Sequence, residues 1–346
     1  AVVGSPLASS RIIPLTDTFR DIVPSDAVVE VLATGFTWSE GVARCELFLF
    51  SDTQTNIMHA WSEAGGLRPW RLPSGFRNDT VYPQRLEPGT NGLLLDPHSR
   101  TLLMCDHGHR RVARLHPEGT TGRAYGGNAA RVETVATHAR GGRLNSPNDL
   151  TFASDGTVVF TDPHYGLRAV GDPNPNPLEW PGCEQGAGVY ALGEHGPEPL
   201  ISSMATPNGL GFSPDGLTLY VVSSGSVTPE LQVYNFGQPP PLEKVSTLIN
   251  WRDTINELKR GGLVDDVNFI GSFDGLVVAA DGTIFLTAPG GFWVLSPTGT
   301  LMGIIATNSK TTNCILHGGF LYATTDSSLV RIRVNVSAQQ PHHKPQ

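Results

Sequence analysis

The feature that most constrains this chain is a pattern that recurs six times along its length. Each copy opens with a polar dipeptide, continues into a short apolar strand, turns, and returns in a second strand rich in β-branched and aromatic residues. The clearest copy runs over residues 145–162. The six opening dipeptides, which recur roughly every 40 to 65 residues, are Glu40-Gly41, Asn91-Gly92, Asn148-Asp149, Asn208-Gly209, Asp274-Gly275 and Asn313-Cys314.

The turn inside the repeat carries its own signal. Asp155-Gly156, Asp215-Gly216 and Asp281-Gly282 stand between paired strands, where a tight hairpin needs a residue that tolerates positive φ. A period of this length with about four strands per copy is typical of a β-propeller, in which each blade packs on its neighbours. The sequence therefore predicts an all-β fold, a six-bladed β-propeller.

The last copy offers only three strands, and the chain ahead of the first copy supplies a spare one. Residues 27–34 alternate as a strand does, so we expect them to pair with the strand near residues 329–334 and close the ring in the last blade. The propeller domain then spans residues 27–336, between an N-terminal arm over residues 1–26 and a flexible tail over residues 337–346.

Two longer stretches interrupt the repeat. Residues 163–188 form a proline-rich loop between a second and a third strand, and Tyr165 in this loop could wall a pocket beside the opening dipeptides. Residues 225–272 are predicted to be the longest break between paired strands. A short helix is expected there over residues 251–260, ending at Gly261-Gly262.

Charge and hydropathy exclude several classes of partner. The net charge is −8 and the basic residues form no stripe, which argues against nucleic acid or an anionic membrane surface as a partner. No apolar run approaches the roughly 18 residues of a membrane span. We expect a secreted protein in its mature form, with sequons for N-glycans at Asn78 and Asn335. The oligomeric state stays open.

The cysteines are Cys45, Cys105, Cys183 and Cys314. They contain no Cys-x-x-Cys pair, which makes a zinc site unexpected. Cys105 and Cys314 stand in apolar strands, where a buried thiol is the commoner outcome. We therefore predict no disulfide.

The opening dipeptides start the first strand of each blade, so we expect their side chains to gather at one end of the propeller. They bring two carboxylates, from Glu40 and Asp274, and several amides. Such oxygen ligands select Ca²⁺, or another hard divalent cation, over Zn²⁺. A bound cation could polarise a carbonyl or phosphoryl oxygen and orient a water nucleophile. Asn-Gly and Asp-Gly are also ordinary turn residues, but here they precede strands, which favours the cation site.

One histidine stands near this end of the predicted propeller. The segment Cys105-Asp106-His107-Gly108-His109 ends the second strand of blade two. His107 could pass protons during hydrolysis, which makes it a candidate catalytic residue; the alternative is a hydrogen-bonded loop histidine. The sequence lacks the motifs of serine hydrolases, zinc proteases, P-loop proteins and dinucleotide-binding proteins.

Several short motifs of the sequence resemble those of the SMP-30/gluconolactonase/LRE-like family of six-bladed propellers, whose relatives include paraoxonase and diisopropylfluorophosphatase. The resemblance runs from about Glu40 to Val334. Cys105-Asp106-His107-Gly108 and residues 145–149 look most like the microbial and fungal lactonases of the family. The other matching words are Ser39-Glu40-Gly41, Pro207-Asn208-Gly209-Leu210, Ser213-Pro214-Asp215-Gly216 and Phe273-Asp274-Gly275.

The resemblance implies roles for the opening residues. Family members bind a catalytic divalent ion at the positions of Glu40, Asn148, Asn208 and Asp274, and the residue matching Asp274 is also proposed as the acid/base. Paraoxonase-like proteins place a histidine pair over the ion, and only His107 could match one member of it. The residues expected to contact substrate are Asn91, Asn148, Asp149, Tyr165 and Asn313.

The leading hypothesis is Ca²⁺-dependent hydrolysis of a lactone, either a sugar-derived aldonolactone or a hydroxy-lactone, with the ion polarising the carbonyl and orienting water. Two alternatives stay open. One is a phosphotriesterase or fluorophosphatase that uses the same cation site, and the other is a non-catalytic propeller that binds a ligand around a structural ion. The sequence does not decide which lactone or stereoisomer would be the substrate.

Overall fold

The computed structural model describes residues 4–8, 10–76, 85–116, 127–170, 186–202, 204, 206–225, 228–264 and 269–339. Asn78, Cys183 and residues 340–346 of the predicted tail lie outside these residues. The chain divides into two compact units, one of residues 36–207 and one of residues 1–35 with 208–346, and each is described by itself.

The first unit contains three four-stranded antiparallel sheets in chain order. The strands of the first are β3 (Ser39–Arg44), β4 (Phe48–Asp52), β5 (Ile57–Ser62) and β6 (Gly66–Arg71). The second has β7 (Thr90–Leu95), β8 (Leu102–Asp106), β9 (Arg111–Leu115) and β10 (Val132–Ala136), followed by the small pair β11 (His138–Ala139) and β12 (Gly142–Arg143). The third has β13 (Leu150–Phe152), β14 (Val158–Asp162), the 3-10 helix η1 (Tyr165–Leu167), β15 (Gly188–Gly193) and β16 (Gly196–Ile201).

The second unit contains the other three sheets. The first has β17 (Pro207–Phe212), β18 (Thr218–Ser223), β19 (Glu230–Asn235) and β20 (Lys244–Asn250), followed by helix α2 (Trp251–Arg260). The next has β21 (Leu276–Val278), β22 (Ile284–Ala288), β23 (Gly291–Leu295) and β24 (Leu301–Ala306), extended by β1 (Arg11–Pro14). The last has β25 (Thr311–His317), β26 (Phe320–Thr325), β27 (Ser328–Arg333) and β2 (Val29–Thr34).

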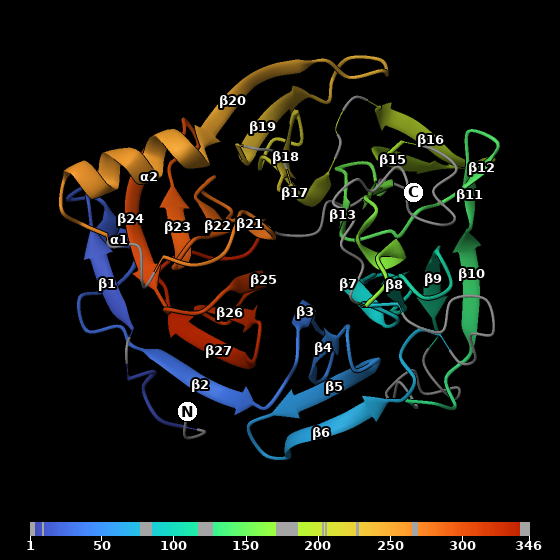
Figure 1. Cartoon of the computed structure of the whole chain (residues 1–346), viewed down its shortest axis with the longest axis horizontal. Helices are drawn as coiled ribbons and strands as arrows, with labels where there is room; N and C mark the ends of the chain where they lie inside the picture. Colours follow the sequence, from blue (N-terminus) through green and yellow to red (C-terminus); the bar gives the residue numbers. More distant parts are fainter. Residues whose placement is uncertain are drawn as a thin grey trace. The chain divides into compact units, whose positions relative to one another are not determined.

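Each predicted repeat thus forms one blade, and the chain is the six-bladed β-propeller that the repeat predicts. The N-terminal strand completes the last blade as expected, since Val29 pairs with Ile332 and Val31 with Val330. Figure 1 shows β2, drawn in blue, beside the red β27. The three Asp-Gly hairpins are also confirmed, because Gly156, Gly216 and Gly282 have φ of 85°, 72° and 87°.

The N-terminal arm is more ordered than its sequence indicated. β1 pairs antiparallel with β24, which makes it a fifth strand of that sheet (Figure 1). Helix α1 (Phe19–Ile22) follows, and the side chain of Phe19 is fully buried. A helix of four residues, two of them charged, leaves no clear period in the sequence, and burial of Phe19 and Ile22 supplies its order.

Two predicted boundaries differ from the structure. The break expected over residues 225–272 is wrong in part, because β19 and β20 pair within it; the helix over residues 251–260 is confirmed as α2. Its Asn250 side chain caps the first turn by accepting from the amides of Arg252 and Asp253. The start of the predicted flexible tail is also ordered, since Ala338 bridges Ala279.

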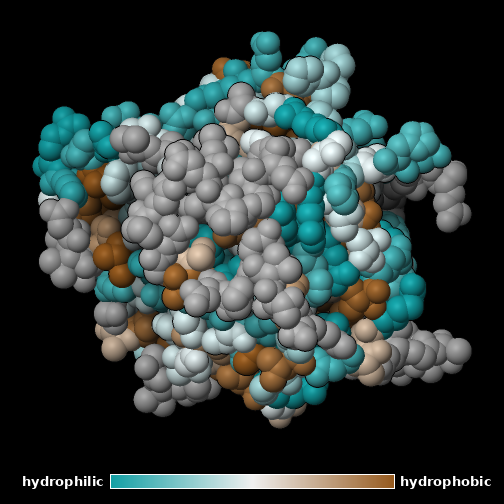
Figure 2. Space-filling view, turned by 45° about the vertical axis from the view of Figure 1, so that its right-hand side comes forward, coloured by the Kyte–Doolittle hydropathy of each residue, from teal (hydrophilic) through white to brown (hydrophobic). Residues whose placement is uncertain are grey.

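Hydrophobic cores lie between neighbouring sheets within each unit. One joins the first two sheets of the first unit through residues such as Leu49 and Met104, and another joins its second and third sheets through Cys105 and Phe160. Cys45, Cys105 and Cys314 are thiols, the last two buried as predicted. On the face drawn in Figure 2, hydrophobic residues are scattered among hydrophilic ones. Among the described helices, none has the length and apolar character that a membrane span requires.

Candidate functional site

In the first unit, three opening dipeptides lie side by side at one end of their sheets. The amide of Gly92 donates to the carbonyl oxygen of Asn148 at 2.8 Å. A Cβ added to Gly41 would lie 2.1 Å from the carbonyl oxygen of Asn91, so only glycine permits this approach of one blade to the next. Glu40, Asn91 and Asn148 therefore stand in series on neighbouring blades.

The same contact recurs among the three blades of the second unit. The amide of Gly209 donates to the carbonyl oxygen of Asp274 at 3.0 Å, and the amide of Gly275 donates to that of Thr312 at 2.7 Å. This places Asn208, Asp274 and Asn313 in a second series. In the four dipeptides that contain glycine, at Gly41, Gly92, Gly209 and Gly275, the glycine thus serves close packing between blades rather than a hairpin turn.

The side chains of the first series offer oxygen atoms for a cation. Glu40 is buried, and its Oε1 accepts a hydrogen bond from the indole Nε1 of Trp38 at 3.1 Å. Asn148 is also buried. The Oδ1 of Asn91 is buried and has no hydrogen-bond partner, which is costly unless a cation or a donor group reaches it. These atoms are hard ligands, which suit Ca²⁺ better than Zn²⁺.

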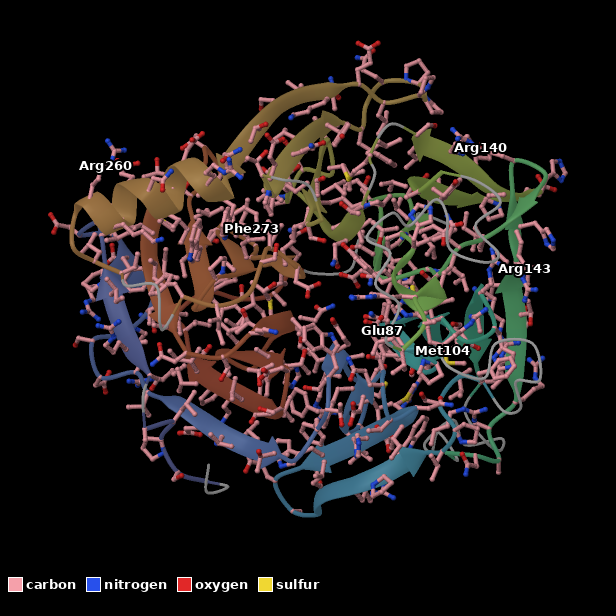
Figure 3. The ribbon with its side chains drawn as sticks, in the orientation of Figure 1. Glu87, Met104, Arg140, Arg143, Arg260 and Phe273 are labelled. Atoms are coloured by element: carbon pink, nitrogen blue, oxygen red, sulfur yellow. The ribbon has the colours of Figure 1, made fainter. Side chains whose placement is uncertain are left out.

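The side chains of the second series are held by their own neighbours. The Nδ2 of Asn208 donates to the Ser224 hydroxyl at 3.2 Å, which leaves its Oδ1 as the available ligand atom. Asp274 is half-buried and follows Phe273, which Figure 3 labels. The fully buried ring of Phe273 meets Trp293 edge-on, with centroids 5.3 Å apart. Asp274 thus directly follows a residue anchored in the hydrophobic core.

In the described part of the chain, no three His, Cys, Asp or Glu side chains gather as a metal site. A cation bound by the opening residues would therefore need amide ligands beside carboxylates. Within the first unit, Glu40 and Asn148 offer one carboxylate and one amide, and within the second unit Asp274 and Asn208 offer the same pair of groups.

In two residues expected to contact substrate, Asp149 and Asn313, a side-chain oxygen accepts a hydrogen bond from the backbone amide of the following residue. The Oδ1 of Asp149 accepts from the Leu150 amide at 2.9 Å, and the Oδ1 of Asn313 accepts from the Cys314 amide at 2.7 Å. These two oxygen atoms therefore help to order the start of the first strand in their blades. Tyr165 is half-buried and begins η1, in the loop where the sequence placed it.

His107 lies at the same end of its sheet as Asn91, directly after β8, but it is completely enclosed. Its side chain has no exposed surface, and a Cβ on Gly166 of η1 would lie 2.7 Å from the Cβ of His107. The Nδ1 of His107 is 3.2 Å from a carboxylate oxygen of Glu87. The alignment is not that of a hydrogen bond, so neither ring nitrogen has a hydrogen-bond partner.

Two loops together cover His107. The guanidinium of Arg85 donates to the carbonyl oxygens of His107 at 3.1 Å and Gly108 at 3.2 Å. The amide of Leu86 donates to the carbonyl oxygen of Arg168 at 2.8 Å, which joins this loop to the one that contains η1. His107 is therefore an interior residue and not one that lines an open pocket.

The sequence analysis missed a set of buried carboxylates near the opening dipeptides of the first unit. Asp52, Asp106 and Asp162 are the last residues of β4, β8 and β14, the second strands of the three blades of the first unit, and all three are buried. The signal was present in the sequence, because each second strand ends in a serine, cysteine or threonine followed by aspartate.

Comparisons with known proteins agree with this architecture. A model of the SMP-30/gluconolactonase/LRE-like region matches residues 32–326. A gluconolactonase of Zymomonas mobilis is 30% identical over 328 residues, which cover 92% of this chain and 84% of that protein. The solved structure of a gluconolactonase from Xanthomonas campestris is 25% identical, with a TM-score of 0.72, and the match covers 96% of this chain and 98% of that one.

A more distant solved structure shares the fold alone. It is a calcium-binding protein, regucalcin, from Agrobacterium tumefaciens, and it is 16% identical with a TM-score of 0.61. The match covers 91% of this chain and 97% of that chain.

Proposed function

Because the chain belongs to the SMP-30/gluconolactonase/LRE-like family, we propose that it is a lactonase that hydrolyses a lactone to its hydroxy acid. The observation that carries this proposal is the 30% identity to a gluconolactonase over nearly the whole chain. A second gluconolactonase with the same fold supports it. The substrate is a small sugar-derived aldonolactone or hydroxy-lactone.

The reaction would use a divalent cation, with Ca²⁺ the first candidate. We propose Glu40, Asn148, Asn208 and Asp274 as its ligands, because they hold the same position in their repeats and offer hard oxygen atoms. The unpartnered Oδ1 of Asn91 and the calcium-binding relative support this choice of ion. When bound, the cation would polarise the lactone carbonyl and stabilise the negative charge that develops on its oxygen.

Asp274 is the better candidate for the acid/base, because its side chain is half-buried whereas His107 has no exposed surface. Its carboxylate would accept a proton as the water oxygen bonds to the carbonyl carbon. The ring C–O bond then breaks, and the departing alkoxide takes up that proton, so the protons balance. Asn91, Asn148, Asp149, Asn313 and Tyr165 remain the candidates for orienting the lactone.

The same ligands could serve a phosphoryl centre, so the deciding experiment compares substrates. The purified protein is assayed against a panel of aldonolactones, γ- and δ-hydroxy-lactones and a phosphotriester, with spontaneous hydrolysis subtracted. We expect turnover of at least one lactone class well above that of the phosphotriester. Turnover of the phosphotriester alone would replace the lactonase with the second candidate, and turnover of neither would favour a binding protein.

A further inference from the structure

Two buried carboxylates hold the backbone just ahead of two of the proposed cation ligands. Asp162 is fully buried, and its two oxygens accept from the amides of Asn145 and Ser146, each at 2.8 Å. These amides belong to the third and second residues before Asn148. The carboxylate therefore fixes the chain that leads directly into this ligand.

Asp52 does the same in the neighbouring copy of the repeat. Its oxygens accept from the amide of Thr37 at 3.2 Å and from the amide of Trp38 at 3.0 Å, which are the third and second residues before Glu40. Trp38 in turn donates its indole N–H to Glu40 at 3.1 Å. Asp52 thus acts on the ligand through one backbone contact and one side-chain contact.

The blade between them provides a natural comparison. Asp106 ends its second strand in the same way, but the third residue before Asn91 is Pro88, which has no amide hydrogen. The amide of Gly89, the second residue before Asn91, donates to the Thr53 carbonyl instead. Asp106 accordingly binds Nδ1 of His109 at 2.8 Å and Nε of Arg111 at 2.9 Å.

The hydrogen-bond partners of these three carboxylates differ in the same way as the proposed roles of the opening residues. In the first unit, the carboxylate clamp is present in the two blades whose opener is a proposed ligand, and the carboxylate is turned to other partners in the blade that opens with Asn91. We propose that Asp52 and Asp162 are positioning residues, which fix Glu40 and Asn148 in the geometry that binds a divalent cation. The inference rests on the proposed function, because it takes these two residues as ligands.

The energetic reason is the cost of ordering the ligands. An ionised carboxylate that accepts two backbone amides makes charge-assisted hydrogen bonds, which are roughly twice as strong as neutral ones, so the comparison is made above pH 7, where Asp162 is ionised. An asparagine of the same shape keeps one acceptor and places an NH₂ group against the second amide. Loss of such an outer partner typically weakens metal binding by about 10- to 100-fold.

The test measures Ca²⁺ binding directly, apart from turnover. Protein stripped with chelator is titrated with Ca²⁺ in a calorimeter as wild type, Asp52→Asn, Asp162→Asn and Asp106→Asn, and the melting temperature of each variant is recorded. Asp106→Asn is the matched control, because it removes an equally buried carboxylate at the same place in the repeat. If Asp162→Asn fails to fold, Asp52→Asn carries the test.

We expect Asp52→Asn and Asp162→Asn to weaken Ca²⁺ binding by about 10- to 100-fold, and Asp106→Asn to keep the wild-type dissociation constant even where its melting temperature falls. Wild-type affinity in a folded Asp52→Asn or Asp162→Asn, or equal losses in all three variants, would overturn the positioning role while leaving the lactonase proposal intact. A wild-type protein that hydrolyses lactone but binds no divalent cation would overturn both this role and the proposed ligands.

Discussion

The amide hydrogen of Gly209 is donated to the carbonyl oxygen of Asp274 at 3.0 Å, and a Cβ at residue 209 would lie only 2.5 Å from that oxygen. Gly209→Ala must therefore push the two blades apart next to a proposed ligand. We expect a loss of unfolding free energy of about 1–3 kcal/mol, the usual cost of overpacking, together with weaker Ca²⁺ binding. Chemical denaturation and calorimetry measure the two effects.

Gly261→Ala is the matched control for this substitution. Gly261 lies in the same unit, has a φ of −77°, and would place its Cβ no closer than 3.6 Å to any neighbour. It should leave both stability and Ca²⁺ affinity near their wild-type values. Equal behaviour of the two variants would show that the close approach at Gly209 has no energetic weight.

The buried carboxyl group of Asp162 should make the free energy of unfolding depend on pH. Burial raises the pKa of Asp162 to about 7, against the opposing effects of the Asn145 and Ser146 amides and of Arg110. The folded chain then binds more protons at this group than the unfolded chain between about pH 4 and pH 7. Stability should fall as pH rises through this window, by an amount on the order of a few kcal/mol.

Urea unfolding of wild type and Asp162→Asn at several pH values between 4 and 8 tests this sign. In Asp162→Asn, the free energy of unfolding should no longer fall as the pH rises through this window. Asp106→Asn should keep this fall, because the pKa of Asp106 is lowered: burial alone would raise it, but His109 and Arg111 outweigh burial. A wild-type protein that grows more stable over the same window, with Asp162→Asn unchanged, would contradict the assigned direction.

The sequence repeat predicted most of the strands, but not all of them. Apolar alternation and Asp-Gly turns predicted the six blades, because these signals are local. The missing strand of the last copy predicted that residues 27–34 pair with the strand near residues 329–334, where Val29 is found opposite Ile332. β1 has only four residues and is recognised through its partner β24, so no local pattern predicted it. The strand–turn periodicity likewise missed β19 and β20.

The repeat also predicted part of the candidate site. Repeat alignment found the opening residues because they hold equivalent positions. It did not find Glu87, which stands in a loop with no repeat equivalent and meets His107 only through the fold. It also placed His107 near a pocket rim, whereas the loops of Arg85 and Gly166 enclose it, and long-range loop packing of this kind leaves no local signal.

His107 and Glu87 should act as one unit. His107→Ala is expected to slow lactone turnover without removing bound Ca²⁺, because it empties the enclosed space beneath Gly166 of η1, next to the candidate substrate contact Tyr165. Glu87→Gln should lower turnover in the same direction. The double variant should lose little more than His107→Ala alone, because interacting residues are not additive.

A double-mutant cycle on turnover measures this coupling. Glu133→Gln is the control, since Glu133 in the outer strand β10 pairs with a histidine of the same blade, His116 directly after β9, at 2.6 Å and at a more exposed place. It should leave turnover unchanged. Fully additive losses at Glu87 and His107, or loss of Ca²⁺ from His107→Ala, would mean that His107 has another role.

Asp274→Asn should abolish lactone turnover while leaving the fold intact. The amide removes a negative charge from the proposed cation ligands and also removes the proposed proton acceptor. Turnover at saturating Ca²⁺, with bound metal quantified in each sample and circular dichroism as the control for folding, separates the two effects. Wild-type turnover by this variant would exclude Asp274 as the acid/base.

The dependence of lactone hydrolysis on a divalent cation tests the account most directly. An aldonolactone that the wild-type protein hydrolyses is assayed by acid release at constant pH, with the protein stripped by chelator and then returned to Ca²⁺, and with spontaneous hydrolysis subtracted. We predict that stripping reduces enzymatic turnover to background and that Ca²⁺ restores it, with Glu40→Gln requiring more Ca²⁺ than wild type. Full turnover by metal-free protein would contradict the central claim.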